Sequence, residues 1–299
     1  MGVSIYKIKK WYRMMTGKSI SHVNQSEGTC YSKSSVAGYY NDLTEKITKD
    51  DPNILIPKYH VDTGEEIYFS IGVFQYGLAA YDMFLKTKED KYKDKFIACS
   101  EWAVSNQQCD GGWNTFQNEH PDHPYSSMAQ GEGISLLIRA HIVTNDDRFL
   151  HAAHNAKDFM LKPIENGGTT KYQGDDVYLH EYTHEPIVLN GWIFSLWGLY
   201  DYCKYTTDSA AEKTLVATLN SLKSMLPVFD AKYWSNYDAG GKICSPFYHN
   251  LHIAQLNTMY DLFGDSIYKE TANKWEKYKN SFWKRKRAFL KKALQKIFE

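Results

Sequence analysis

Mostly apolar stretches recur along the chain at a nearly constant spacing. Tyr81, Tyr200 and Tyr260 each stand late in such a stretch, and Ala140 holds the same place in another. Neighbouring stretches are therefore about 60 residues apart. A period of this length exceeds that of most repeat proteins and accommodates two helices with their loops.

Each apolar stretch is followed by a polar break and then by a more amphipathic segment. An amphipathic segment is typical of a helix with one face in solvent. We expect these second helices over residues 91–107, 147–161, 209–226 and 267–281. Apolar helices alternating with amphipathic ones predict an inner and an outer layer, in which each pair buries its neighbour. The chain is therefore expected to be all-α, with an α/α toroid over residues 38–281.

The segments between the expected helix pairs are long and rich in Gly, Asp, Asn, His and Pro. Residues 108–125 and 163–189 predict loops with short strands, and residues 233–247 predict a β-hairpin around Ala239-Gly-Gly. Long loops in a compact domain are uncommon unless they carry function. We expect these loops to lie at one mouth of the toroid and to hold its chemistry.

Composition excludes several classes of protein. The hydrophobic content of 43% and the charged content of 23% are those of a globular chain. No apolar stretch approaches the roughly 20 residues of a membrane-spanning helix, and the N-terminus lacks the apolar run of a signal peptide. The five cysteines are scattered without metal-ligand spacing, which favours free thiols in a reducing compartment. We expect a cytoplasmic protein that binds no nucleic acid.

The formal net charge of zero conceals two basic ends. The first 18 residues carry five basic side chains and no acid, and residues 282–299 carry seven basic side chains and one acid. We interpret residues 1–37 as a basic arm and residues 282–299 as a basic amphipathic helix. Its apolar side is expected to hold Trp283, Phe289, Leu290, Leu294, Ile297 and Phe298.

A basic amphipathic helix of this kind tends to lie in an anionic membrane surface. The protein is therefore expected to be peripheral on the inner face of the membrane. The alternative is a solvated helix that closes the toroid, and the sequence leaves both interpretations open.

The run His180-Glu-Tyr-Thr-His184 matches a zinc-protease pattern, which needs a helix to bring both imidazoles to one face. Pro186 follows closely, and the preceding run over residues 167–176 is not helical in character. No metal site is therefore expected.

An acid stands next to a phenol at Glu181-Tyr182, and two more tyrosines occupy polar settings at Tyr237 and Tyr248. Taken singly, each tyrosine would more often be an ordinary buried residue with a bonded hydroxyl. Their order and spacing make them resemble the C-terminal domain of D-glucuronyl C5-epimerases. The resemblance extends over roughly residues 38–280 and includes Gly38-Tyr-Tyr-Asn-Asp-Leu-Thr-Glu-Lys, Ile71-Gly-Val-Phe-Gln-Tyr-Gly, Gly111-Gly-Trp113 and Ser126-Ser-Met-Ala-Gln-Gly.

The resemblance implies an isomerase that inverts C5 of glucuronate to iduronate in a heparosan-like polysaccharide without a cofactor. It places Glu181, Tyr182, Tyr237 and Tyr248 in the site. C5 epimerisation removes a proton α to a carboxylate and returns one to the opposite face, so it needs a base, an acid and charge stabilisation. We assign Tyr248 and Tyr182 as the proton-transfer pair and Glu181 as a second base or an orienting group.

The substrate carboxylate requires a cation, and the animal enzymes have an arginine where this chain has Gly240. Lys242 and Arg139 are the candidates, although Arg139 lies on an apolar helix and has a structural ion pair as an equal alternative. The other residues expected to bind substrate are Trp113, Tyr125, Gln130, Asn190, His249, His252 and Gln255.

Two other functions stay open at this point. A polysaccharide lyase begins with the same abstraction of the C5 proton and then expels the O4 substituent. A relative that has lost activity would only bind glycan, and Gly240 gives a motive for that reading. The oligomeric state is also open, with a homodimer as one outcome.

Overall fold

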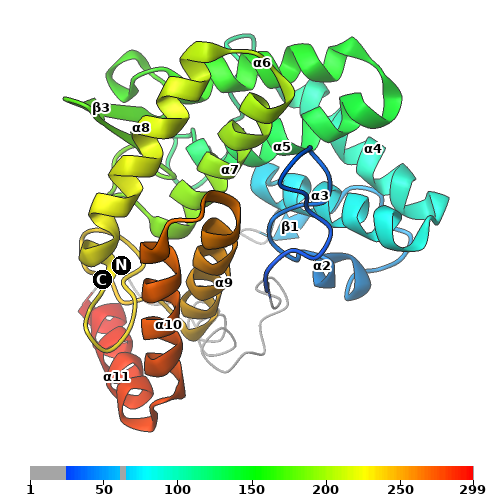
Figure 1. Cartoon of the computed structure of the whole chain (residues 1–299). Helices are drawn as coiled ribbons and strands as arrows, with labels where there is room; N and C mark the ends of the chain where they lie inside the picture. The colour runs from blue at the N-terminus through cyan, green and yellow to red at the C-terminus, as the bar shows by residue number, and fades with distance from the viewer. Residues whose placement is uncertain (1–24, 61–64, 299) are drawn as a thin grey trace.

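The computed structural model describes residues 25–60 and 65–298 (Figure 1). These residues are mostly helical, which confirms an all-α class. The helices, in chain order, are α2 (Glu45–Thr48), α3 (Ser70–Thr87), α4 (Asp90–Asn106), α5 (Ser127–Thr144), α6 (Asp147–Leu161), α7 (Leu189–Tyr205), α8 (Ser209–Met225), α9 (Pro246–Phe263), α10 (Ser266–Asn280) and α11 (Phe282–Phe298). Short 3-10 helices lie at Ile164–Asn166 and Leu226–Phe229.

The helices alternate between the two expected kinds. α3, α5, α7 and α9 are largely buried, whereas α4, α6, α8 and α10 bury one face each. The amphipathic helices begin and end within one residue of the predicted ranges. The period of about 60 residues is therefore a repeat of helix pairs, as the apolar pattern predicted.

Consecutive inner helices pack side by side, α3 on α5, α5 on α7 and α7 on α9. The approach of α5 to α7 is close because Gly131 faces the backbone of α7, where an added Cβ would lie 2.5 Å from the Cα of Ser195. The hydroxyls of Ser127 and Ser195 bond at 2.8 Å across the same contact. These contacts establish a succession of helix pairs, and closure into a toroid stays a prediction.

The segment before α2 joins the first and last inner helices. The backbone N–H of Tyr39 donates to Asp82 of α3 at 2.9 Å, and the carbonyl of Tyr40 accepts a hydrogen bond from Thr258 of α9. Residues 1–24 of the expected basic arm lie outside the described residues. Residues 25–37, which precede this segment in the chain, also contact α9. Tyr31 donates to Asp261 of α9, and Lys33 forms an ion pair with the same carboxylate.

Strands are few and short in the described residues. β1 (Tyr59–His60) pairs with β2 (Glu66–Ile67), and β3 (Thr170–Gln173) pairs with β4 (Asp176–Leu179), both antiparallel. The β3–β4 hairpin lies in the loop of residues 163–189, where short strands were expected.

The hairpin predicted over residues 233–247 forms only in part. Asn236 and Ile243 face each other in an isolated antiparallel bridge, and the N–H of Tyr237 donates to Lys242 and that of Cys244 to Ser235 beside it. The pairing extends no further because neighbouring N–H groups bond outside the stretch. Asn236 donates to Phe229, and Ala239 donates to Ile187.

None of the described helices is long and apolar enough to cross a bilayer.

Arg139 is completely buried and forms an ion pair with Asp201 of α7 at 2.6 Å. Its remaining donors reach the backbone carbonyls of Ala37, Gly38 and Ser135. The guanidinium therefore ties α5 to α7 and to the segment before α2. This is the structural ion pair that the sequence left as the alternative to binding substrate.

We expect Arg139→Met to destabilise the fold strongly, because it leaves the carboxylate of Asp201 buried without its cation. Breaking a buried pair in this way costs about 3–5 kcal/mol. The measurement is the free energy of unfolding in urea. Arg148→Met is the control, since Arg148 forms exposed ion pairs with Glu101 and Asp146 and should change the midpoint little. Equal losses in both variants would contradict a structural role for Arg139.

Candidate functional site

Two segments far apart in the sequence meet where α7 begins. The backbone N–H of Leu189 donates to the carbonyl of Tyr237 at 3.2 Å, and that of Ala239 donates to Ile187 at 2.9 Å. These bonds hold the loop that carries Glu181 against the segment that carries Tyr237. The loop residues therefore owe their position to backbone pairing and not to a helix.

The four residues expected at the site lie in one cluster. Tyr248 stands in the first turn of α9, where Ser245 caps the helix by accepting from its N–H. The rings of Tyr237 and Tyr248 have centroids 5.0 Å apart. Side-chain hydrogen bonds join Tyr182 to both Glu181 and Tyr237.

Glu181 is 6% exposed and packs on Gly191 in the first turn of α7. A Cβ at Gly191 would lie 2.2 Å from Oε2 of Glu181, so the carboxyl occupies space that any side chain there would fill. Oε2 has no hydrogen-bond partner in the structure. Burial raises the pKa of Glu181 to about 8, while the hydrogen bond with Tyr182 acts in the opposite direction.

The three tyrosines are held as neutral phenols. Burial, followed by the nearby charge of Glu181, raises the pKa of Tyr182, Tyr237 and Tyr248 above the ordinary value for a phenol. Glu181 is therefore the member of the cluster that changes charge near neutral pH. A group with a pKa close to the working pH is suited to general acid–base catalysis.

The tyrosines retain partly exposed side chains despite this strong desolvation. Their rings are therefore partly shielded by the fold and still partly reached by solvent. Tyr182 stacks on Phe116, with ring centroids 4.4 Å apart.

Asn190 and Gln255 lie next to this cluster, as expected. The side-chain amide of Gln255 donates to the backbone carbonyl of Asn190 at 3.2 Å, which joins α9 to α7. Oδ1 of Asn190 and Oε1 of Gln255 are buried without partners. Buried polar atoms are rarely left unpaired, so these two oxygens stand out among the buried groups next to the cluster.

Sequence reasoning missed two charged residues, Glu132 and Lys46. Glu132 is fully buried on α5 and accepts a hydrogen bond from Gln75 at 2.8 Å, while its Oε2 has no partner. Burial raises its pKa well above the ordinary value, and the charge of Glu181 acts in the same direction. A carboxyl between two glycines in a largely buried helix is the pattern that could have revealed it.

Lys46 belongs to α2 and is half-buried. Burial lowers its pKa to about 8, and the negative charge of Glu132 acts in the opposite direction. Lys46 thus combines partial exposure with desolvation, as the tyrosines do.

Three residues predicted to bind substrate contact the scaffold. Trp113 is 1% exposed and its indole donates to the carbonyl of Ala103 at 2.9 Å. With its amide nitrogen toward Gly111, Gln130 donates to the carbonyl of Gly111 and accepts from the N–H of Trp113, both at 3.2 Å. Tyr125 packs edge-on against Phe159 of the outer helix α6. That these residues also bind substrate stays a prediction.

His249 and His252 lie under the site in an aromatic stack. His249 stacks on Trp234 with centroids 3.6 Å apart, and its ring nitrogens contact Ser235 and the carbonyl of Trp275. Burial lowers the pKa of both histidines to about 3, so both are neutral near pH 7. Nδ1 of His252 also contacts Ser235, whereas its Nε2 is buried without a partner.

Lys242 lies at the rim of the site but faces acids. Its ammonium is 3.3 Å from Glu185 and 3.9 Å from Asp238. Gly240 is exposed on the same turn, next to Pro186. The carboxylates around Lys242 weaken it as a ligand for a substrate carboxylate.

The zinc-protease pattern lies in a loop, so its two histidines do not share a helix face. His180 is buried, whereas His184 is exposed and stacks on His123. Over residues 25–60 and 65–298, no group of three or more metal-ligating side chains is arranged to hold an ion.

Comparisons of the sequence with known proteins identify the family to which the chain belongs. The model of the family "D-glucuronyl C5-epimerase C-terminus" matches residues 108–277. The chain therefore belongs to the C5-epimerase family, whose enzymes are isomerases.

Two relatives extend the comparison. The chain is 28% identical to a D-glucuronyl C5-epimerase of Caenorhabditis elegans over 221 residues, which are 64% of this chain and 36% of that protein. It is 34% identical to an uncharacterized protein of Methanocaldococcus jannaschii over 155 residues, 50% of each chain. The matched region thus spans half or less of each relative.

Proposed function

We propose that the protein inverts C5 of glucuronate residues in a polysaccharide and so forms iduronate. The observation that carries this proposal is the grouping of Glu181, Tyr182, Tyr237 and Tyr248 in one desolvated cluster of a C5-epimerase family member. The cluster offers an acid that titrates near pH 8 and phenols that can donate or relay protons.

The proposed reaction has two proton transfers. Tyr182 removes the C5 proton as its own hydroxyl proton passes to the Glu181 carboxylate, so the C5–H bond pair enters the enediolate. Tyr248 then donates its hydroxyl proton to the opposite face of C5. Tyr237, bonded to Tyr182, steadies the phenolate that forms there. Exchange with solvent returns the proton from Glu181 to Tyr248, and the reverse reaction exchanges the two tyrosine roles.

Lys46 is the cation that we propose for the substrate carboxylate. Arg139 is already paired with Asp201, and Lys242 lies beside Glu185 and Asp238. The charge of Lys46 instead interacts with Glu132. Burial raises the pKa of Glu132 and so favours its neutral form. A protonated Lys46 would neutralise the negative charge that develops on the carboxylate when C5 loses its proton.

The direct test is incorporation of solvent deuterium at C5. We expect label in a panel of glucuronate-containing glycans that begins with heparosan, without the ultraviolet absorbance of an unsaturated product. Tyr248→Phe should keep the fold and lower turnover by a factor on the order of 100, the usual scale for a lost acid–base group.

The outcomes separate the rival functions. An ultraviolet-absorbing product would identify a lyase. Glycan binding without label would identify a relative that only binds. Unchanged turnover in Tyr248→Phe would remove Tyr248 from the mechanism.

We expect a bell-shaped pH dependence of kcat/KM with its maximum near pH 8. Glu181 must be deprotonated to accept a proton, so activity falls as pH drops below its pKa of about 8. Lys46 must be protonated to bind a carboxylate, so activity also falls as pH rises above its pKa of about 8. Glu181→Gln should lower activity and abolish the acidic limb; a limb that survives unchanged belongs to another group.

Lys46→Met should raise KM by about tenfold or more, because a charge-assisted hydrogen bond contributes about 1.5–3 kcal/mol. Lys46→Arg keeps the charge and should retain most of the binding while losing the alkaline limb of the pH profile. Lys242→Met is the matched control, and its effect on KM should be smaller. A larger effect at Lys242 than at Lys46 would reverse the assignment.

A further inference from the structure

α11 packs on the body through one narrow side. Ala288 is 4% exposed and Lys292 is 8% exposed, so these residues mark the side in contact. One turn further, the side chain of Gln295 accepts from the N–H of Ile243 at 2.9 Å and donates to the carbonyl of Gly241 at 3.1 Å. The spacing 288, 292 and 295 is that of one helix face.

The opposite side of α11 is apolar and faces solvent. Trp283 is 77% exposed, Leu290 62% and Leu294 52%, and helical spacing places them together, away from Ala288. Phe282 and Phe289 are 51% and 47% exposed and lie between this side and the side in contact with the body. The side chains of Ile297 and Phe298, which the sequence assigned to the same side, lie outside the described part of the chain.

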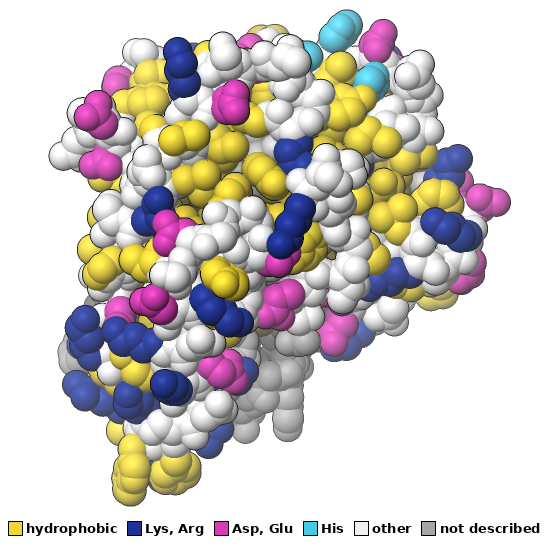
Figure 2. Space-filling view, in the orientation of Figure 1, with side chains coloured by type: hydrophobic (Ala, Val, Ile, Leu, Met, Phe, Trp, Pro, Cys, Tyr) yellow, Lys and Arg dark blue, Asp and Glu magenta, His cyan; other side chains and the backbone are white. Residues whose placement is uncertain are grey.

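This orientation decides between the two interpretations that the sequence left open. A helix that closed the fold would turn its apolar side toward the body and its cations toward water. α11 does the reverse, because its large apolar side chains point outward and a small residue, Ala288, faces the body. Hydrophobic side chains protrude where α10 meets α11, at the lowest point of Figure 2.

Cations flank the apolar side. Between Phe282 and Phe298 the sequence has seven basic residues and no acid. Figure 2 shows Lys and Arg side chains gathered over α11. Arg285, Lys286, Arg287 and Lys291 are exposed and lie around the apolar side. Apolar residues at the centre with cations at the margins are the arrangement of a helix that lies in a membrane interface.

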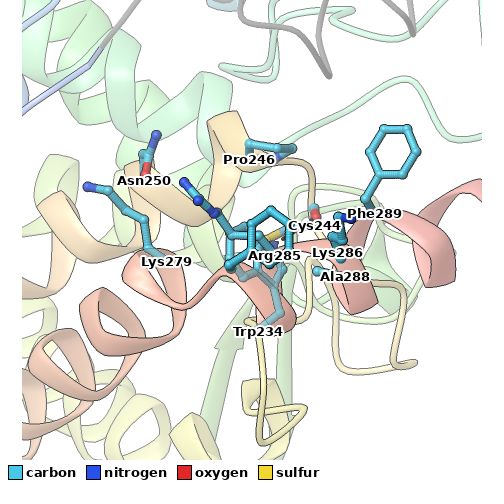
Figure 3. Close-up of a pocket in the computed structure, with 10 residues that line it drawn as sticks. Trp234, Cys244, Pro246, Asn250, Lys279, Arg285, Lys286, Ala288 and Phe289 are labelled. Carbon is cyan, nitrogen blue, oxygen red and sulfur yellow. Dashed lines mark hydrogen bonds between the residues drawn. The ribbon is translucent and has the colours of Figure 1, made fainter.

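A hollow of about 470 Å³ separates α11 from α9 and the segment of residues 234–244. Lys279, Arg285 and Lys286 line it together with Trp234 and Phe289. Figure 3 shows Arg285 between Lys279 and Lys286 over this hollow. A site with cations at its rim and aromatic walls fits an anionic headgroup with the start of its acyl chain.

We infer that α11 inserts its apolar side into the surface of an anionic membrane, with its cations on the lipid headgroups. A second copy of the chain is a poorer occupant, because two helices of this charge repel each other. A soluble acidic partner would match the charge of α11 but would not supply the lipid headgroup and acyl chain that fit the hollow. The membrane supplies both the negative charge and the apolar layer.

The attachment would also position the tyrosine cluster. Gln295 bonds to the turn of residues 241–243, which follows Tyr237 and precedes the α9 turn that carries Tyr248. α11 therefore contacts the stretch between these two tyrosines, and a glycan anchored in the same membrane would lie near them. This second step rests on the proposed function, whereas membrane binding by α11 does not.

The test compares full-length protein with vesicles of phosphatidylcholine alone and of phosphatidylcholine with phosphatidylserine. We expect sedimentation with the anionic vesicles at low salt and release at high salt. The double variant Trp283→Gln, Leu290→Gln should lose binding to the anionic vesicles even at low salt. Arg285→Gln with Lys291→Gln should weaken it by about tenfold or more, since each basic residue near such a surface contributes to binding.

The control variant is Val216→Gln with Lys213→Gln, which changes an exposed apolar residue and an exposed cation on α8. It should bind as the parent protein does. Equal binding by parent and Trp283→Gln, Leu290→Gln would overturn the inference, as would equal binding to neutral vesicles. So would a dimer that depends on Trp283 and Leu290 and binds no vesicles. Loss of vesicle binding with normal turnover on short soluble glycans would leave the proposed function intact.

Discussion

The buried carboxylate of Asp201 is the constraint around which the chain is organised. It accepts hydrogen bonds from Arg139 and Ser135 of α5 and from the hydroxyl of Tyr40 in the segment before α2. A charge in this apolar interior is stable only when fully paired, so these three donors must arrive together. Asp201 thereby fixes α5 against α7 and also draws in the segment that leads to α2. The position of Lys46 depends on that connection.

The buried polar groups of and beside the inner helices are of two kinds. Around Arg139 and Asp201, in the later turns of α5 and α7, the carboxylate oxygens and the guanidinium nitrogens have partners. Buried carboxyl or amide oxygens on Glu132, Glu181, Asn190 and Gln255 have no partner in the structure. Each such unpaired group costs about 1–3 kcal/mol. Under the proposed function, the hydroxyls of a glycan would form hydrogen bonds with these four oxygens.

The sequence predicted the helix pairs well because burial itself has a period. Inner helices are apolar on every side and outer helices on one, so the alternation is visible without coordinates. The cluster of Glu181 and the tyrosines came from the order of motifs and not from helical pattern. Pairing partners were beyond sequence reasoning. Whether Arg139 meets Asp201 or a ligand depends on which residues of α7 and the preceding segment face it. The hairpin at residues 233–247 is only partial for the same reason, since the N–H groups of Asn236 and Ala239 find partners in other segments.

α11 and the tyrosine cluster are joined by the short stretch between Tyr237 and Tyr248. Its backbone pairs with residues 187–189 on one side and with Gln295 on the other. Hydrogen bonds with two different neighbours restrict this stretch. α11 therefore contacts the segment that begins at Tyr237 and leads into the first turn of α9, where Tyr248 stands. Because proton transfer needs the tyrosines within hydrogen-bond reach of C5, the proposed catalysis and the proposed docking of α11 share one structural element.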